Sequence, residues 1–104
     1  MKRPELDVLE EKMTTIAKNY FLARRYLNYT HYISEDNFAL LCSYISSVKK
    51  AFTHLKNEEQ KLLNNEYFYE APLDWWKKEY SLQGYNNLKN TAIAHFLEVF
   101  HVGY

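Results

Sequence analysis

The chain has 104 residues, 47% of them apolar and 17% aromatic, and its 13 basic and 13 acidic side chains leave no formal net charge. This apolar content suffices for a folded core, so we expect a single domain and exclude a wholly disordered chain. Only two glycines and two prolines interrupt the sequence, which favours long helices because sandwiches and barrels need many tight turns.

The first 27 residues carry the pattern of a long helix. Proline suits the first position of a helix, so we expect this one to begin at Pro4. Apolar residues then recur at alternating spacings of three and four, the heptad pattern of a helix that packs lengthwise on a partner. Arg24 and Arg25 near its end complement the helix dipole. The heptad positions are Leu6, Leu9, Met13, Ile16, Tyr20, Ala23 and Leu27.

A second helix with the same pattern is predicted after Ser34, which suits the N-terminal cap position. The short connection between the two helices, residues 28–33, favours an antiparallel hairpin over residues 1–57. Apolar side chains beside the heptad positions, such as Phe21 and Tyr44, would remain uncovered in the hairpin alone. We therefore expect the C-terminal half or a second copy of the chain to cover them. The heptad positions are Phe38, Leu41, Ile45, Val48, Phe52 and Leu55.

Three shorter helices are predicted for residues 58–104. Asn57 and Gln60 have the spacing of a capping box, which opens a helix. Pro72 can occupy the first position of a short helix, and Ser81 can cap a last one. These elements complete an all-α fold in which a long antiparallel hairpin is followed by a compact three-helix unit, the two packed together as one domain.

Adjacent tryptophans lie on the predicted short helix. Consecutive helical residues point about 100° apart, so Trp75 and Trp76 cannot both face one core without wide burial. We expect one to pack in the core of the three-helix unit and the other to meet either the long hairpin or a partner chain. In the second case Trp76 would serve as an interface anchor, since tryptophan is enriched among residues that dominate binding. The last helix is expected to run to about Phe100.

Four amide side chains recur along the last predicted helix at the spacing i, i+3, i+4 and i+7: Gln83, Asn86, Asn87 and Asn90. This spacing places them on one stripe of the helix. Amides both donate and accept hydrogen bonds, as recognition of an adenine edge in the DNA major groove requires. Alternatively, the stripe is a solvated helix face in an asparagine-rich chain, or a surface that recognises another protein.

The charge is divided unequally along the chain. Residues 1–57 carry nine basic and six acidic side chains, for a charge of +3, and residues 58–104 carry four basic and seven acidic side chains, for −3. Neutralisation of phosphates supplies much of the affinity of DNA-binding domains. An acidic C-terminal half is therefore an unfavourable place for a DNA-binding surface.

Catalytic and metal-binding patterns are missing from the sequence. The four histidines are scattered and have no second ligand at metal spacing, and no glycine-rich phosphate loop is present. The single cysteine, Cys42, cannot form an internal disulfide, which fits a reducing compartment. No apolar run reaches the roughly 18 residues needed to cross a bilayer, and no apolar signal core follows Met1. We expect a cytoplasmic protein without enzymatic activity, cofactor, metal, small-molecule substrate or membrane contact.

The C-terminal half is similar to a known helix-turn-helix family. The residues that carry the similarity are Glu58–Leu63, Tyr67–Phe68, Trp75–Tyr80 and then Ser81, Tyr85, Leu88, Ala92 and Phe96–Leu97. In these positions the chain resembles the region-4 helix-turn-helix of sigma-70-type factors and the ArpU-like regulators of small Gram-positive, mycoplasma and phage proteins. The resemblance implies a recognition helix that begins at Ser81. It also implies a nucleic-acid-binding face made of Gln83, Asn86, Asn87, Lys89 and Asn90, with Lys77 and Lys78 near the DNA backbone.

Two hypotheses about function follow. The first is a small transcription-associated helix-turn-helix protein whose DNA binding is weak or lost, with DNA or RNA polymerase as partner. The second is a helical protein–protein interaction module or homodimer without a nucleic-acid role, and the division of charge favours it. The interface residues that we expect in this case are Leu6, Leu9, Met13, Ile16 and Trp76.

Overall fold

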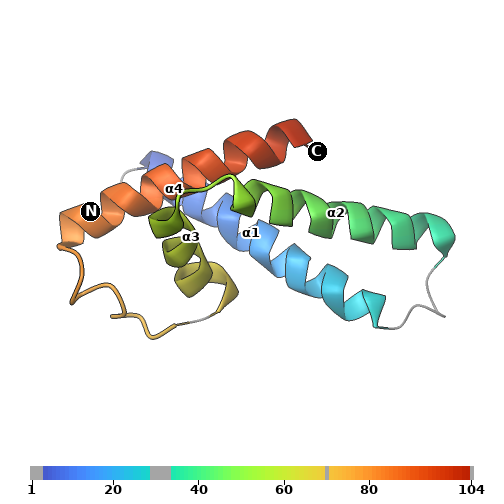
Figure 1. The fold of residues 1–104 in the computed structure, drawn as a ribbon, viewed down its shortest axis with the longest axis horizontal. Helices are drawn as coiled ribbons and strands as arrows, with labels where there is room; N and C mark the ends of the chain where they lie inside the picture. Colours follow the sequence, from blue (N-terminus) through green and yellow to red (C-terminus); the bar gives the residue numbers. More distant parts are fainter. Residues whose placement is uncertain (1–3, 29–33, 70, 104) are drawn as a thin grey trace.

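The computed structural model describes residues 4–28, 34–69 and 71–103, and the side chains of residues 8–28, 34–69 and 71–100. Over these residues the protein is all-α, as predicted, with a long helical hairpin followed by a smaller helical unit (Figure 1). The elements are α1 (Pro4–Leu27), α2 (Glu35–Thr53), α3 (Asn57–Leu63), the π-helical turn η2 (Asn64–Phe68) and α4 (Leu82–Gly103).

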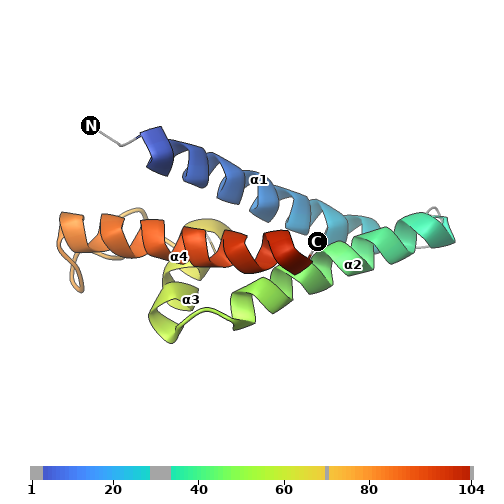
Figure 2. The same ribbon diagram turned by 90° about the horizontal axis from the view of Figure 1, so that it is seen from above.

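The predicted hairpin forms, although two heptad positions of its second helix differ from the prediction, since Phe38 is exposed and Leu55 lies after the end of α2. α1 begins at Pro4 and ends at Leu27, and α2 follows Ser34, whose Oγ accepts a hydrogen bond of 3.2 Å from the amide of Asn37. The two helices lie side by side and project beyond the end of α4 (Figures 1 and 2). The predicted cap at Ser34 is confirmed.

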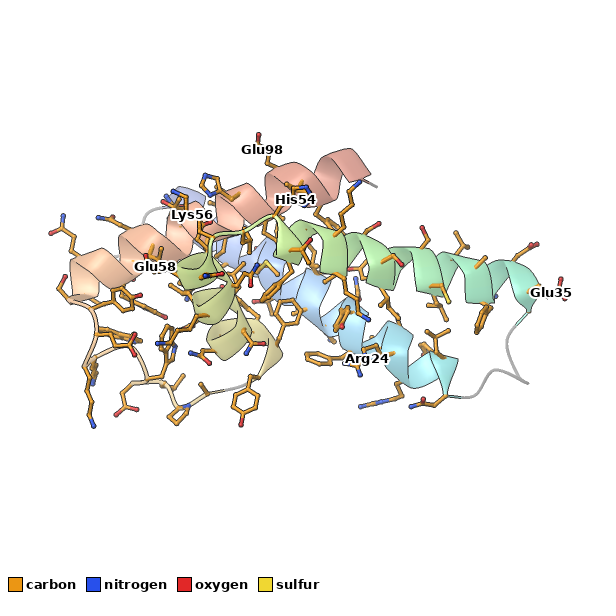
Figure 3. All side chains as sticks on the ribbon, viewed as in Figure 1. Arg24, Glu35, His54, Lys56, Glu58 and Glu98 are labelled. Atoms are coloured by element: carbon orange, nitrogen blue, oxygen red, sulfur yellow. The ribbon has the colours of Figure 1, made fainter. Side chains whose placement is uncertain are left out.

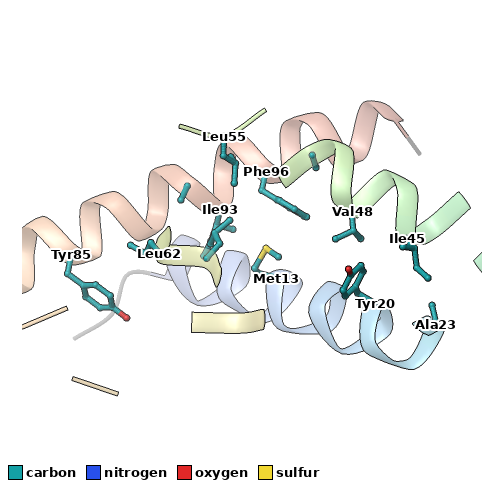
Figure 4. Packing of buried hydrophobic residues seen from close by; sticks show 13 residues of the cluster. Met13, Tyr20, Ala23, Ile45, Val48, Leu55, Leu62, Tyr85, Ile93 and Phe96 are labelled. Atoms are coloured by element: carbon teal, nitrogen blue, oxygen red, sulfur yellow. The ribbon is translucent and has the colours of Figure 1, made fainter. Parts of the chain in front are cut away.

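The helix α4 covers the hairpin. Seen from above, it lies between α1 and α2 (Figure 2), and its residues Ile93 and Phe96 are fully buried. They pack with Met13 of α1 and Val48 of α2 in one hydrophobic core (Figure 4). Burial of such side chains stabilises the fold by about 1.5–3 kcal/mol each. The chain's own C-terminal helix therefore covers the apolar side of the hairpin.

This packing shows that one of the predicted interface residues, Met13, is wrong, and it places two others, Leu9 and Ile16, against the chain's own core. Met13 is 0% exposed within the protein's own core, so it cannot contact a second chain. Leu9 and Ile16 are half-buried and also pack against that core. The side chain of Leu6 lies outside the described residues. Because α4 covers this side of α1, a second copy of the chain cannot pack on it.

The junction between α2 and α3 is capped one residue earlier than predicted. Lys56, not Asn57, is the N-cap residue of α3, and its amide donates to Oε1 of Glu59 at 3.0 Å. Gln60 turns back instead, and its Nε2 donates to the carbonyl oxygens of Phe52 and Leu55, both at 3.1 Å. Gln60 thus bonds two carbonyl groups at the end of α2, of which that of Phe52 also accepts from the Leu55 amide at 3.1 Å, and it fixes the turn between the two helices.

The short helix predicted after Pro72 does not form. Residues 73–79, the turn segment, make consecutive turns. Backbone hydrogen bonds in it join residues three apart: Trp75 N donates to the Pro72 carbonyl at 3.0 Å, and Lys77 N donates to the Asp74 carbonyl at 3.1 Å. The prediction was wrong because tertiary contacts of the two tryptophans override the local helical preference. An irregular backbone can direct both indole rings to the same place, which a helix cannot.

The last helix begins as predicted and ends later. Ser81 caps α4, since its Oγ accepts a hydrogen bond of 3.0 Å from the amide of Gly84. A Cβ atom at Gly84 would lie 3.1 Å from the same oxygen, so a residue without a side chain suits this tight cap. α4 continues to Gly103, beyond the predicted end near Phe100.

Candidate functional site

The predicted row of amides on α4 is only partly exposed. Gln83 and Asn87 are exposed, whereas Asn86 and Asn90 are half-buried. The Oδ1 atom of Asn90 is buried and has no hydrogen-bond partner among the described residues. Asn90 is therefore not the outward-facing residue that the spacing predicted. Two exposed amides on one side of the helix offer a smaller recognition surface than four.

The two lysines expected near a DNA backbone, Lys77 and Lys78, are exposed in the turn segment before α4. Lys61, also in this half of the chain, is paired with Glu79 at 2.7 Å on the surface. Exposed pairs of this kind contribute little to stability. Lys77 and Lys78 therefore remain available for contacts at the surface, next to the ion pair of Lys61 with Glu79.

Lys89 is used inside the molecule, which corrects its predicted role at a nucleic-acid surface. Only 12% of its side chain is exposed, and its Nζ lies 2.6 Å from a carboxylate oxygen of Glu10 in α1 and 3.4 Å from one of Glu66 in η2. The same ammonium group lies 5.7 Å from the ring centre of Tyr67 and 5.6 Å from that of Tyr85. Two carboxylates therefore surround the one cation of the predicted recognition face.

Glu66 is the acceptor at the centre of this cluster. Its Oε1 accepts hydrogen bonds from the indole Nε1 of Trp75 at 2.9 Å and from the hydroxyl of Tyr85, and its Oε2 accepts one from Lys89. The three donors come from the turn segment and from α4. Together with Glu10, these bonds join α1, η2, the turn segment and α4. We call these residues the Glu66 cluster: Glu10, Glu66, Tyr67, Trp75, Tyr85 and Lys89.

Both tryptophans pack on the ring of Tyr85. Trp76 is stacked on it, with ring centres 4.4 Å apart and planes 12° apart, while Trp75 approaches it edge-on at 6.3 Å. Trp76 is half-buried and donates from Nε1 to the Leu73 carbonyl at 3.1 Å. These contacts engage the ring within the chain, and its role as an interface anchor stays a prediction.

The environment of the Glu66 cluster raises the pKa values of two tyrosines, Tyr67 and Tyr85. Burial, followed by the negative charges of Glu10 and Glu66, raises the pKa of Tyr67 above its ordinary value. Burial, followed by the hydrogen bond to Glu66 and the negative charge of that residue, raises the pKa of Tyr85 in the same direction. Both phenols are therefore held neutral. The hydroxyl of Tyr67 has no hydrogen-bond partner among the described residues.

A cleft of about 380 Å³ lies between α1, α2 and η2. Four aromatic side chains line it, and Arg24 and Lys49 contribute the cationic groups of its lining. Val48, Thr53 and Asn64 complete the lining. The aromatic residues are Tyr20 and Phe21 of α1, Phe52 of α2 and Phe68 of η2.

The aromatic rings of the cleft pack mainly edge to face. The Tyr20 and Phe68 rings are 5.6 Å apart at 90°, and the Phe52 and Phe68 rings are 6.0 Å apart at 85°. Phe21, which is exposed, lies 6.1 Å from Phe68. The rings of the cleft therefore face in different directions, and they do not form a flat platform of parallel rings.

The cations of the cleft have no ion-pair partner within the described part of the chain. The guanidinium group of Arg24 lies 5.7 Å from the ring centre of Tyr20, and it projects from the same side of the molecule as the turn segment (Figure 3). Both Arg24 and Lys49 are exposed. The cleft therefore combines an apolar interior with uncompensated positive charge.

The sequence contained only an indirect signal of the cleft. Phe21 lies beside the heptad positions of α1, and packing between the two helices of the hairpin does not account for an apolar residue there. The contribution of Phe68 could not be predicted, because it depends on how η2 is placed against the hairpin.

Comparisons with protein-family models, with curated proteins and with solved structures found no match. Among the residues described, no group of three or more histidine, cysteine or acidic side chains is placed to hold a metal ion. Within the same residues, no helix combines the length and apolar character that a bilayer crossing requires. The resemblance to the sigma region-4 family stays a prediction.

Replacing Lys89 with methionine tests the Glu66 cluster. We expect Lys89→Met to lower the free energy of unfolding by about 3 kcal/mol, because it removes the cation that is paired with the largely buried carboxylates of Glu10 and Glu66. Urea unfolding followed by circular dichroism measures the change. The matched control, Lys77→Met, removes an exposed lysine and should change stability by less than about 0.5 kcal/mol. Equal stability of the two variants would contradict the placement of Lys89.

The raised tyrosine pKa values predict a loss of stability in alkali. Above about pH 10, the ordinary pKa of tyrosine, the unfolded chain releases protons that Tyr67 and Tyr85 keep in the folded chain. The unfolded state then binds fewer protons, so the free energy of unfolding falls as the pH rises further. Below that pH the two residues cause no such dependence.

Ultraviolet titration of tyrosinate, combined with urea unfolding at several pH values, checks this expectation. Tyr85→Phe should make the alkaline loss of stability shallower, whereas Tyr69→Phe, at an exposed site, should leave it unchanged. If every tyrosine of the folded protein ionised in one step near pH 10, the expectation would be refuted.

Proposed function

We propose that this protein is a non-enzymatic recognition module that binds an acidic segment of a partner protein in the cleft between α1, α2 and η2. The observation that supports this proposal is the composition of the cleft. An aromatic interior of about 380 Å³ is bordered by Arg24 and Lys49, and neither residue is paired with a carboxylate among the described residues.

The shape of the cleft suits an aliphatic or aromatic side chain. Pockets for small ligands and side chains are mostly apolar, with a few placed polar groups that fix orientation. Here the edge-to-face packing of Tyr20, Phe52 and Phe68 makes an apolar recess. A nucleobase binds best on a flat, exposed ring face, and only Phe21 among the four rings is classed as exposed. A protein side chain is therefore the better occupant.

The charge at the cleft selects an acidic partner. Arg24 and Lys49 belong to the half of the chain with a charge of +3. Complementary charge raises the association rate and disfavours partners of like charge. Carboxylates beside the apolar anchor of a partner would lie near both cations, and a basic segment would be repelled.

Nucleic-acid binding through residues 83–90 is the weaker candidate. DNA affinity depends on cations that can neutralise phosphates, and the one cation of that face, Lys89, is held between Glu10 and Glu66. Asn90 is half-buried. Lys77 and Lys78 alone supply little electrostatic affinity. RNA polymerase as a partner would require a protein-binding surface, for which the cleft is the better candidate.

A peptide titration tests the proposal. The probe is a short fluorescein-labelled peptide in which a single leucine is flanked by aspartates, and fluorescence anisotropy reports binding. We expect saturable binding that weakens with added salt, because the charges involved are partly exposed. The double variant Arg24→Glu with Lys49→Glu should bind about tenfold more weakly or worse, a loss of at least 1.4 kcal/mol.

Three controls make the titration specific. Lys12→Glu, at an exposed position of α1 outside the cleft, should bind the peptide as the unaltered protein does. A peptide with lysines in place of the aspartates should not bind. The proposal is contradicted if both peptides bind equally, if the double variant binds normally, or if a single-stranded oligonucleotide binds the same residues more tightly than the acidic peptide.

A further inference from the structure

The turn before α4 presents an exposed leucine beside an acidic residue. Leu73 is 94% exposed, the highest value among the large apolar residues that the structure describes. Pro72 and Asp74 on either side of it are exposed as well. Leucine so fully in contact with water adds nothing to the core. An exposed apolar side chain that the fold does not use is suited to an interaction surface.

This turn is held in place from within the chain. The Pro72 carbonyl accepts a hydrogen bond of 3.0 Å from Trp75 N, and the Leu73 carbonyl accepts one of 3.1 Å from the indole of Trp76. Trp76 is itself stacked on Tyr85 of α4. The backbone of Leu73 is thereby fixed while its side chain is exposed. A preorganised segment loses less conformational entropy on binding.

The turn has the chemistry that the cleft selects. It offers one aliphatic side chain, Leu73, with the carboxylate of Asp74 next to it, and the cleft offers aromatic rings with Arg24 and Lys49. Arg24 and Lys49 of the cleft belong to the half of the chain with a charge of +3, and Asp74 belongs to the half with a charge of −3. Lys77 and Lys78, which follow Asp74 in the turn segment, are exposed as well. One copy of the protein therefore carries both the site and a segment that complements it.

We propose that two copies of this chain associate by placing the turn around Leu73 of each copy, at the start of the turn segment, in the aromatic cleft of the other copy. This inference rests on the proposed function, since it assigns the acidic segment to a second copy. The turn segment and the C-terminal part of α1 lie along the same side of the molecule (Figures 1 and 3). In the proposed dimer, a two-fold axis would pair each turn with the cleft of the other copy, which gives a closed assembly with two equal contacts.

This dimer differs from the one that the heptad pattern predicts. The apolar seam of α1 is covered by α4 inside each copy, so it contributes nothing to the interface. The contact instead joins an end of the smaller helical unit to the side of the hairpin. Because each contact is small, we expect a weak association that depends on concentration and on salt.

Sedimentation equilibrium of the full chain is the test. The average mass should rise from 12.6 kDa toward about twice that value as the protein concentration increases from about 10 μM to about 1 mM, the range of a weak interface. Leu73→Asp should keep the mass at that of the monomer and leave the fold intact, because position 73 is on the surface. Leu40→Asp, at another exposed leucine, should dimerise normally.

A charge exchange identifies the contact. Asp74→Lys alone and Arg24→Asp alone should each weaken association about tenfold, and the variant that carries both changes should regain it. The dimer proposal is overturned if the unaltered chain stays at monomer mass throughout, if Leu73→Asp dimerises normally, or if the double exchange fails to restore association.

The outcomes also separate the two proposals. A monomeric chain that still binds the acidic peptide in its cleft overturns the dimer and leaves the proposed function standing. A chain that neither self-associates nor binds the peptide overturns both. Dimerisation that survives Arg24→Glu with Lys49→Glu would show that the copies meet elsewhere, and it would likewise overturn the inference.

Discussion

The carboxylate of Glu66 is the interaction on which the arrangement of this protein depends. It accepts hydrogen bonds from Trp75, Tyr85 and Lys89, and Lys89 is bonded in turn to Glu10 of α1. A buried carboxylate is costly unless it is paired and fully hydrogen-bonded. This requirement fixes η2 against α4, the turn segment and the N-terminal part of the hairpin. Local helical preference is overridden along the turn segment because the two tryptophans must reach this cluster and Tyr85.

The same short element connects the cluster to the cleft. Glu66 and Phe68 lie two residues apart in η2, and Phe68 contacts the rings of Tyr20, Phe21 and Phe52 in the cleft. Short π-helical turns are often found at functional sites. Here the π-helical turn directs a carboxylate to one side and an aromatic ring to the other. The polar cluster thus positions a residue of the proposed binding site, although no residue of the cluster lines the cleft itself.

Much of the fold was predictable because its causes are local. Pro4, the heptad pattern and the caps at Ser34 and Ser81 marked α1, α2 and the start of α4 at or near their observed positions. What failed depends on contacts between distant residues. The fate of Lys89 is set by Glu10 and Glu66, and neither the spacing of the amides nor the family resemblance contains that information. The helix expected after Pro72 was lost to contacts with Tyr85 and Glu66. The cleft combines residues from three elements, so only its unexplained member Phe21 was visible in the sequence.

The link between the cluster and the cleft can be measured in one variant. Glu66→Gln keeps the shape of the side chain but removes the charge that Lys89 requires, and Glu66 does not line the cleft. The acidic-peptide affinity of this variant, determined under conditions in which circular dichroism shows it folded, should be several-fold weaker than that of the unaltered protein, because Phe68 loses its fixed position. An unchanged affinity would contradict the account, since the cleft would then be formed independently of the carboxylate that we place at the centre of the structure.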